Sequence, residues 1–320
     1  MKLGVFTPVF GRLSCGEMLE AVRALRHVQA VELGTGCWPG AAHVDVERLQ
    51  SAEGAREFRG RIADAGLVIS ALSCHGNPLH PNAAIAGRDD DVFRRTVLLA
   101  ERLDVPVVVT FSGCPGDSEQ ARHPNWVTSP WPPEMSEMLE WQWEQRAIPY
   151  WRETTRYAAE HGVKVAIEPH PNFLVYNTET ALRLREGGGP NLGVNFDPSH
   201  FFWQGIDIPV AIRALGDAIF HVHAKDVALD AERVAMNGVI DAKSYRRMRD
   251  RSWIFRTVGS GHSEFEWKRI VAALRLAGYD GVISIEHEDA LASVDEGVHG
   301  AVDVLSRIIF KEPPAEAWWT

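Results

Sequence analysis

Four acidic or imidazole residues follow apolar runs in the second half of the chain. Glu168 ends VKVAIE, Asp197 follows LGVNF, His223 ends AIFHVH and Glu286 follows GVISI. Each run is typical of a buried parallel strand, so each of these side chains is predicted at the C-terminal end of a strand. Carboxylates and imidazoles held close together bind divalent ions; Mn²⁺ is the most expected, and Mg²⁺, Co²⁺ or Zn²⁺ also suit such a site. The pattern therefore predicts one divalent metal ion held by these four residues.

Each of these residues has an ordinary structural alternative when it is taken alone. Glu168 could form an ion pair at the rim of a sheet, and Asp197 could cap the turn that Asp-Pro favours. Glu286 opens an acidic cluster, EHED, most of which suits a solvated edge. His221 lies two residues before His223 on the same strand face, but its deeper position fits an interior histidine. Their occurrence together on four successive predicted strands is what favours a metal site.

Strand-like runs alternate with runs of helical periodicity along the chain. The predicted strands span residues 2–6, 30–33, 67–73, 107–111, 163–168, 192–197, 218–223 and 281–286. Three helix starts carry a capping box: Ser14 with Glu17, Ser263 with Glu266, and Ser293 with Glu296. Repeated βα units of this kind predict an α/β fold, a (β/α)₈ TIM barrel. A doubly wound open sheet is less favoured, because the first predicted strand is followed by TPVFGRLS and not by a glycine-rich phosphate loop.

The chain is longer than a barrel requires, and the extra residues fall in two loops. A TIM barrel takes about 250 residues, whereas this chain has 320. The surplus lies in residues 112–136, after the fourth predicted strand, and in residues 224–262, after the seventh. Both loops extend the face on which such barrels keep their active sites. We therefore expect a single domain, a barrel over residues 1–310, followed by a C-terminal tail at 311–320.

The bulk composition argues against several classes of partner. A formal net charge of −10 and a pI of about 5.7 disfavour a nucleic-acid-binding surface. The sequence shows no apolar run long enough for a membrane span and no secretory leader, so we expect no membrane partner. The 4 cysteines have no CxxC spacing and fit reduced thiols. The expectation is a cytoplasmic protein that acts on a small molecule and forms a homo-oligomer.

The motifs IEPHP, NFDPSH, HVHAKD and SIEHED are similar to those of the xylose-isomerase-like TIM-barrel superfamily, the sugar phosphate isomerase/epimerase family. The resemblance covers nearly the whole chain. It implies that Glu168, Asp197, His223 and Glu286 hold a metal ion, and that His200, three residues after Asp197, contacts the substrate. The DNA-repair barrels of this superfamily are disfavoured, because one of their extra ligands is a histidine after the fourth strand, where this chain has VVVTFSG.

Further polar residues follow the predicted strand ends. His170 lies two residues beyond Glu168 and is a candidate acid or base; a histidine of a surface loop is the alternative. His75 follows the third strand and could reach the substrate, or could be an ordinary loop histidine. Lys225 could contact a substrate oxygen or pair with Asp226 at the rim. We predict that His170 is catalytic and that His75 and Lys225 bind substrate.

The two insertions supply aromatic and basic candidates. Trp126 and Trp131, in the first insertion, could stack on the face of a sugar ring. Alternatively, they pin the loop to the barrel or line an oligomer interface. Arg256, near the end of the second insertion, could hold a phosphate or carboxylate, although a solvated run of charges is the alternative. We predict that all three residues bind substrate.

These residues together predict a divalent-metal-dependent isomerase or epimerase of a keto sugar or related polyol. Glu168 and Glu286 would take and return a proton next to a carbonyl group, through an enediolate that the metal stabilises. The first alternative is a lyase or dehydratase on an inosose or 3-keto-glycoside, in which the same enediolate expels a leaving group. The second alternative is a metal-bearing barrel that binds a ligand without catalysis.

Overall fold

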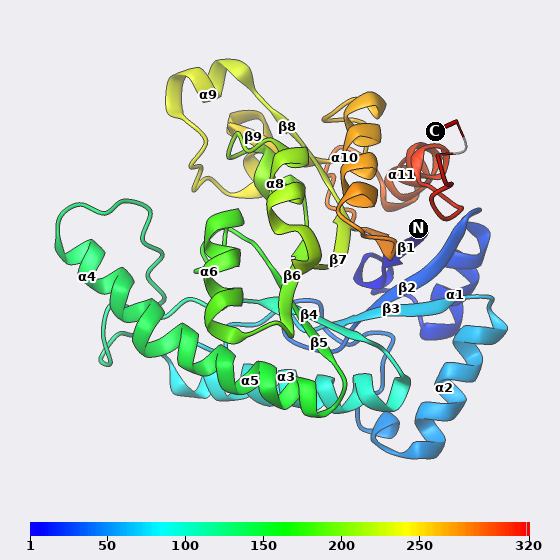
Figure 1. Ribbon diagram of the computed structural model, residues 1–320, viewed down its shortest axis with the longest axis horizontal. Coiled ribbons are helices and arrows are strands. Elements are labelled where there is room, and N and C mark those ends of the chain that lie inside the picture. The colour runs from blue at the N-terminus through cyan, green and yellow to red at the C-terminus, as the bar shows by residue number, and fades with distance from the viewer. Residues whose placement is uncertain (318) are drawn as a thin grey trace.

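Parallel strands close into a barrel in the computed structural model of the chain, which describes residues 1–317, 319 and 320 (Figure 1). Trp318, in the C-terminal tail, lies outside the described residues. Around the barrel the strands follow the order β1-β10-β7-β6-β5-β4-β3-β2. Their bounds are β1 (Lys2–Phe6), β2 (Val28–Gly34), β3 (Val68–Ser73), β4 (Val107–Phe111), β5 (Lys164–Glu168), β6 (Leu192–Phe196), β7 (Ile219–Ala224) and β10 (Val282–Ile285). The predicted (β/α)₈ barrel is confirmed, and the open sheet is excluded because the sheet closes on itself.

A long helix follows each barrel strand and packs outside the barrel (Figure 1). These helices are α1 (Cys15–Ala24), α2 (Ala52–Asp64), α3 (Ala83–Leu103), α5 (Ile148–Glu160), α6 (Thr178–Gly188), α8 (Ile208–Leu215), α10 (Glu264–Leu276) and α11 (Val294–Ile308). The shorter elements are η1 (Thr7–Phe10), η2 (Arg48–Gln50), α4 (Glu134–Trp141), η3 (Gln142–Ala147), α7 (Ser199–Phe202), η4 (Gly216–Ala218), β8 (Asp226–Leu229), α9 (Ala231–Asn237), η5 (Tyr245–Asp250) and β9 (Trp253–Arg256). The three predicted capping boxes are confirmed: Ser14, Ser263 and Ser293 cap α1, α10 and α11.

The barrel strands are buried because they face helices on one side and the barrel interior on the other. Every residue of β4 and β6 is buried. Because the barrel strands pair in parallel, their C-terminal ends meet at one rim, and the register of β4 with β5 sets Phe111 beside Glu168. Asp197 and Glu286 are the residues that directly follow β6 and β10. The fold therefore brings the predicted ligands to the same end of the barrel.

The first insertion, residues 112–136, leans on the loop that follows β5. The backbone N–H of Val175, in that loop, donates to Ser112 Oγ at 3.0 Å. The buried Gln142, in the π-helix η3, donates through Nε2 to the carbonyl oxygen of Asn125 at 2.8 Å. These bonds hold an irregular stretch of chain between β5 and the helix that follows the insertion.

The second insertion, residues 224–262, contains the antiparallel pair β8–β9. The buried Asp226, near the start of the insertion, holds the end of the insertion in place. Asp226 Oδ2 accepts hydrogen bonds from the backbone N–H groups of Gly259, Gly261 and His262, at 3.0, 3.2 and 3.0 Å. His262 Nδ1 also lies 2.7 Å from Oδ1 of the same carboxylate. One buried side chain therefore satisfies the backbone of the returning loop.

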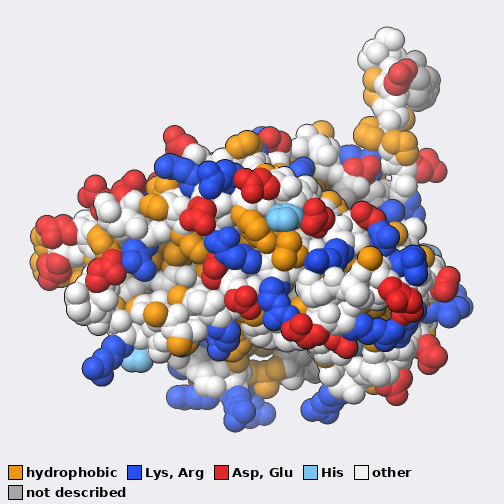
Figure 2. Space-filling view, turned by 90° about the horizontal axis from the view of Figure 1, so that it is seen from below, with side chains coloured by type: hydrophobic (Ala, Val, Ile, Leu, Met, Phe, Trp, Pro, Cys, Tyr) orange, Lys and Arg blue, Asp and Glu red, His pale blue; other side chains and the backbone are white. Residues whose placement is uncertain are grey.

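Charged side chains of both signs are mixed over the face that carries α3 and α5 (Figure 2). Arg94 of α3 and Glu153 of α5, for example, form an ion pair of 3.3 Å. A mixed face of this kind presents no extended field of one sign. In the described residues, no helix combines the length and the apolar character that crossing a bilayer requires.

Candidate metal centre and active site

The predicted metal ligands converge at the C-terminal rim of the barrel. Glu168 ends β5, Asp197 follows β6, His223 lies on β7 and Glu286 follows β10. Each offers one ligand atom, and these atoms all lie within 4.8 Å of one another. His223 Nδ1 lies 2.9 Å from Glu286 Oε2 and 3.3 Å from Glu168 Oε2. The side chain of Glu286 is 15 % exposed and lines a cavity, whereas the other three are buried.

Several donor atoms at this rim are buried without a hydrogen-bond partner among the described residues. They include Asp197 Oδ2, His223 Nδ1 and both ring nitrogens of His200. Charged groups nevertheless lie near two of these atoms: Lys225 Nζ is 3.0 Å from Asp197 Oδ2, and Glu286 Oε2 is 2.9 Å from His223 Nδ1. Three carboxylates and one imidazole are a donor set that suits a divalent cation. The residues present therefore fit one divalent ion.

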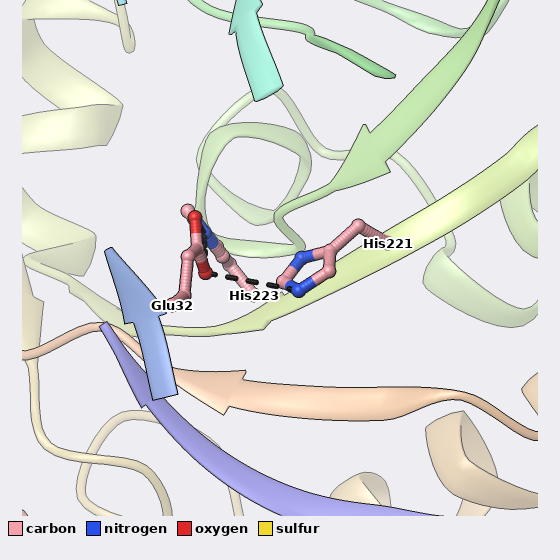
Figure 3. A group of neighbouring side chains, drawn as sticks. All are labelled: Glu32, His221 and His223. Carbon is pink, nitrogen blue, oxygen red and sulfur yellow. Dashed lines mark hydrogen bonds and ion pairs between the residues drawn. The ribbon is translucent and has the colours of Figure 1, made fainter. Parts of the chain in front are cut away.

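A second cluster of ligand-type residues consists of Glu32, His221 and His223 (Figure 3), and it shares His223 with the first cluster. His223 Nε2 lies 3.0 and 2.9 Å from the two carboxylate oxygens of Glu32, and Ser73 Oγ donates to the same carboxylate. Both ring nitrogens of His223 thus face carboxylates, since Nδ1 lies 2.9 Å from Glu286 Oε2. Burial alone would lower the pKa of His223, but these carboxylates raise it well above its usual value. With a metal ion bound, Nε2 would keep its proton toward Glu32 and Nδ1 would be the ligand atom. Burial alone would raise the pKa of Glu32, but His223 and His221 lower it to about 2. This hydrogen-bonded cluster supports the first cluster and does not form a separate site.

A second hydrogen-bonded chain reaches Glu168 from inside the barrel. His221 Nδ1 lies 3.0 Å from Asn195 Oδ1, and Asn195 Nδ2 donates to Glu168 Oε2 at 2.8 Å. His75 Nε2 lies 3.0 Å from the same oxygen. Burial lowers the pKa of His221 to about 4, so this imidazole is neutral near pH 7, as suits an interior histidine. These contacts fix Glu168 Oε2 and leave Oε1 facing His200 at 3.4 Å.

Lys225 places a buried ammonium group at the edge of the carboxylates. Its Nζ lies 3.0 Å from Asp197 Oδ2, 2.9 Å from Glu286 Oε2 and 3.2 Å from Glu288 Oε2. Burial alone would lower the pKa of Lys225, but Asp197, Glu286 and Glu288 raise it well above its usual value. The alternative partner, Asp226, is engaged by the second insertion. Lys225 therefore stays charged and lines the cavity.

His200 and His170 lie together beside the ligand oxygens. Their ring centroids are 4.3 Å apart, and His200 Nε2 lies 3.2 Å from Asp197 Oδ2. His170 Nδ1 lies 2.7 Å from the carbonyl oxygen of Pro171, which can only accept, so Nδ1 carries the proton. Burial and the neighbouring His200 lower the pKa of His170 to about 3. His170 is therefore neutral near pH 7 and offers Nε2 as a proton acceptor.

The carboxylates open into a cavity of about 670 Å³, a volume typical of small-molecule sites. Glu168, Glu286, Lys225 and His75 form its floor. The aromatic and apolar lining includes Phe6, Trp38, Phe111, Pro171, Phe173 and Tyr245. Further polar residues of the lining lie beyond the candidate metal ligands, namely Asn172, His287 and Glu288.

The two tryptophans that were predicted to bind substrate, Trp126 and Trp131, do not line this cavity. Trp126 is half-buried and packs against Tyr176, with ring centroids 5.5 Å apart, and Trp131 is 77 % exposed. No described residue of the first insertion, 112–136, lines the cavity. The first insertion leans outward over the loop after β5, so the loops after β1, β2 and β5 line the cavity in its place. The geometry gives Trp126 and Trp131 no place at this cavity.

Two basic residues of the second insertion, Arg256 and Lys243, pair with nearby carboxylates. Arg256 Nε donates to Asp289 Oδ2 at 3.1 Å, and Lys243 Nζ lies 2.9 Å from Asp241 Oδ1. Arg256 is absent from the cavity lining. Its guanidinium group helps to hold the loop after β10, so the geometry does not support its predicted role in binding a phosphate.

The cavity and its support include residues that the sequence patterns did not single out. Glu32 lies inside the predicted strand 30–33, where an acid within the apolar run AVEL was a signal comparable with the four that were used. Trp38 lies in GCWPG, a sequence that indicates a turn but gives no sign of a ligand. Glu288 belongs to the EHED cluster and lines the cavity beside Lys225.

Comparison with known proteins agrees with this fold. The chain is 37 % identical over 313 residues to the uncharacterized protein YfiH of Bacillus subtilis (strain 168), which covers 97 % of this chain and 99 % of YfiH. The structure of IolI with a bound zinc atom superposes with a TM-score of 0.65 at 18 % identity, over 98 % of this chain and 100 % of that chain. The 3-keto-D-glucoside 4-epimerase YcjR from E. coli gives a TM-score of 0.63 at 15 % identity, over 96 % and 98 %. The xylose isomerase-like TIM barrel model matches residues 20–307, and the chain belongs to that family.

Proposed function

We propose that the protein is a divalent-metal-dependent isomerase or epimerase that acts on a keto sugar or a related polyol. The observation that carries the proposal is the convergence of four ligand-type side chains, whose ligand atoms all lie within 4.8 Å of one another: Glu168, Asp197, His223 and Glu286. Two of them, Glu168 and Glu286, line a cavity of small-molecule size. The zinc-bound IolI structure and the 3-keto-D-glucoside 4-epimerase, which share the fold, agree with the proposal.

A bound divalent ion would polarise a substrate carbonyl group and acidify the proton on the neighbouring carbon. Glu168 and Glu286 reach the cavity from β5 and β10, which are separated in the barrel by β6 and β7. One carboxylate can therefore remove the proton while the other returns a proton from another direction. Return to the opposite face of the same carbon gives an epimer, and return to the neighbouring carbon gives an isomer.

The other polar groups of the floor would orient the substrate. Lys225 Nζ is positioned to donate to a substrate oxygen on which negative charge develops, because it is charged and lines the cavity. His170 Nε2 can accept a hydrogen bond from a substrate hydroxyl group, since its Nδ1 proton is engaged by Pro171. The surrounding aromatic side chains would keep water from the reacting carbon.

A lyase or dehydratase is the second candidate, because the cavity leaves room for a leaving group. It would begin with the same proton abstraction. Expulsion of a leaving group is helped by a proton donor, and His170 suits that role poorly because its lowered pKa of about 3 leaves it neutral. The isomerase or epimerase is therefore the favoured function.

The test is incubation of the Mn²⁺-loaded protein with a panel of keto sugars in D₂O, followed by NMR and mass spectrometry. We expect deuterium at the carbon next to the carbonyl group and a product of otherwise unchanged mass. Chelation should stop the exchange and Mn²⁺ should restore it, and Glu286→Gln should abolish it. Glu101→Gln is the matched control, because Glu101 is an exposed partner of His161 on the outside of the barrel.

Each competing function gives a different result in the same experiment. Loss of water or of an aglycone would identify the lyase. Binding of the sugars without exchange at any carbon would identify a non-catalytic barrel. Conversion of a sugar without solvent exchange would overturn proton abstraction as the mechanism.

A further inference from the structure

One carboxylate of the cavity lining stands outside the candidate metal ligands. Glu288 lies two residues after Glu286, in the loop that follows β10, and its side chain is 49 % exposed. It lines the cavity, as Glu168 and Glu286 do, but it is not one of the four residues whose ligand atoms converge. Like charges held close together destabilise one another, so a carboxylate in this position needs a role that offsets the repulsion.

The loop that carries Glu288 is fixed by the residue that follows it. Asp289 is buried, and its Oδ2 accepts hydrogen bonds from the backbone N–H of Thr257 at 2.8 Å and from Arg256 Nε at 3.1 Å. Its Oδ1 accepts from the backbone N–H of Leu291 at 2.8 Å. These bonds join the loop after β10 to the end of the second insertion. The backbone of Glu288 is therefore held in place before any ligand binds.

The side chain of Glu288 is held through one of its two oxygens. Oε2 lies 3.2 Å from Lys225 Nζ, and the same buried ammonium group lies 3.0 Å from Asp197 Oδ2 and 2.9 Å from Glu286 Oε2. No described residue donates a hydrogen bond to Glu288 Oε1. An ionised carboxylate can only accept hydrogen bonds. Oε1 is thus an oriented acceptor, without a donor from the described residues, on a side chain that lines the cavity.

Glu288 lies within reach of a sugar that is bound at the candidate metal ligands. Glu286 Oε2 and Glu288 Oε2 are 2.9 and 3.2 Å from the same Lys225 Nζ, so the sum of these distances places them at most roughly 6 Å apart. With C–C bonds of about 1.5 Å, a six-carbon sugar spans that distance. A hydroxyl group beyond the reacting carbons can therefore meet Glu288 while the carbonyl end of the sugar lies at the candidate metal ligands.

Two simpler roles for Glu288 explain less of this geometry. One is to balance the charge of Lys225, but Asp197 and Glu286 already lie against that ammonium group. The other is a solvated acidic edge, as expected for most of the EHED cluster. The contact with a buried lysine and the place in the cavity lining do not fit a solvated edge.

We propose that Glu288 determines sugar specificity, by accepting a hydrogen bond at Oε1 from a hydroxyl group of a six-carbon keto sugar, beyond the two oxygens that a metal ion would chelate. The inference rests on the proposed function, since it names a specificity residue of the same site. A hydrogen bond to a charged group is stronger than one between neutral groups. A site built to bind a hydroxyl group also rejects an analogue that lacks it. Glu288 would thus select sugars at a carbon that takes no part in the reaction.

The experiment measures, by calorimetry on the Mn²⁺-loaded protein, the binding of D-fructose, D-psicose, D-sorbose and D-tagatose. The sugar that binds most tightly is then compared with its analogues that lack one hydroxyl group, at the fourth, fifth or sixth carbon. We expect one analogue to bind about 10- to 100-fold more weakly than its parent sugar, the range of a hydrogen bond to a charged group. Glu288→Ala should reduce this ratio to about twofold or less, because only the parent sugar loses a partner. Glu288→Gln keeps a neutral acceptor and should leave a ratio of about 2- to 10-fold.

The Mn²⁺ content should be unchanged in both variants, because Glu288 is outside the candidate ligand set. Glu101→Ala, at an exposed carboxylate on the outside of the barrel, is the control and should keep the wild-type ratio. If Glu288 serves only to hold Lys225, Glu288→Ala will weaken the parent sugar and every analogue by the same factor. A ratio that survives in this way would overturn the inference, and so would a wild-type protein that binds all three analogues as tightly as the parent sugar.

The proposed function fails by a different observation, the absence of solvent exchange with every keto sugar in D₂O. Solvent exchange together with a ratio that is insensitive to Glu288→Ala would sink only the inference. A ratio that collapses in Glu288→Ala, without exchange at any carbon, would sink only the function. Failure of all four sugars to bind would overturn the inference, because it is stated for six-carbon keto sugars.

Discussion

Replacement of Glu32 by glutamine tests whether the contact between Glu32 and the candidate metal ligand His223 contributes to metal affinity. Glu32 is fully buried, and both of its carboxylate oxygens lie within 3.0 Å of His223 Nε2. Glutamine can still accept a hydrogen bond from Nε2 through its one carbonyl oxygen, so the orientation of the ring should survive. The negative charge behind the imidazole and one of the two contacts are lost. The change therefore lowers the basicity of Nδ1 while its position is kept.

The expected magnitude follows from the position of Glu32 behind a ligand. Loss of such a partner costs about 10- to 100-fold in metal affinity, which is about 1.4–2.7 kcal/mol of binding free energy. Glu32→Gln keeps one of the two contacts, so we place it near the tenfold end. Glu32→Ala leaves His223 Nε2 and Ser73 Oγ without their acceptor, so we place it near the hundredfold end.

The assay is titration of the metal-free protein with Mn²⁺ by calorimetry, with thermal melting of the metal-free proteins to show that each variant is folded. The matched control is Glu101→Gln, which makes the same chemical change at an exposed carboxylate 3.0 Å from His161 Nδ1. The control should bind Mn²⁺ as the wild type does. A folded Glu32→Gln protein with a dissociation constant within twofold of the wild-type value would refute the reasoning.

Three further outcomes are expected. Asp197→Ala should reduce the metal content, close to one ion per chain in the wild type by elemental analysis, to a small fraction; full occupancy would mean that the ligand set is wrong. Asp226→Asn should lower the free energy of unfolding by about 2–4 kcal/mol in urea titrations, because both carboxylate oxygens accept from backbone N–H groups and the NH2 group of the amide would face such a donor in either orientation; an effect below about 0.5 kcal/mol, the size of an ordinary surface change, would contradict this account. A keto sugar should bind more tightly than its phosphate ester in calorimetry on the Mn²⁺-loaded protein, and the reverse order would show that the cavity supplies a cation for the phosphate.

The barrel could be predicted from the sequence because its determinants are local. The apolar runs at 2–6 and 107–111 coincide with β1 and β4, and the capping boxes mark the first turns of α1, α10 and α11. The predicted ends are less accurate where pairing extends past the apolar residues. β2 begins at Val28, before the predicted run 30–33, because backbone hydrogen bonds to β1 do not need buried side chains.

The convergence of the candidate ligands was also predictable, because parallel strand ends must meet at one rim. The role of Glu32 could not be predicted, although the sequence does show this acidic residue within an apolar run. Glu32 and His223 are 191 residues apart in sequence, and their strands β2 and β7 are separated in the barrel by β1 and β10. Their contact crosses the barrel interior and depends on closure and register, which no local pattern specifies.

The positions of the loop residues were the least predictable, because irregular segments have no periodicity that fixes where a side chain points. The tryptophans of the first insertion lie on a loop that packs against the residues after β5 and not over the cavity. Trp38 lies in a short turn whose path depends on its bond to the backbone of His75. The aromatic side chain expected at the cavity from a long loop is therefore found there on a short one, as Trp38.

The charges at the floor of the cavity favour an uncharged substrate. Glu168, Asp197 and Glu286 carry three negative charges, which one divalent ion and Lys225 together would balance. Glu32 adds another negative charge behind His223, since its lowered pKa of about 2 keeps it ionised. A sugar phosphate would bring about 1.5–2 further negative charges. Among the described residues that line the cavity, Lys225 is the one lysine or arginine, and three carboxylates already surround it. A phosphate would thus be desolvated without a cation to pair with, whereas a neutral keto sugar would add no charge to a floor that already has a negative balance.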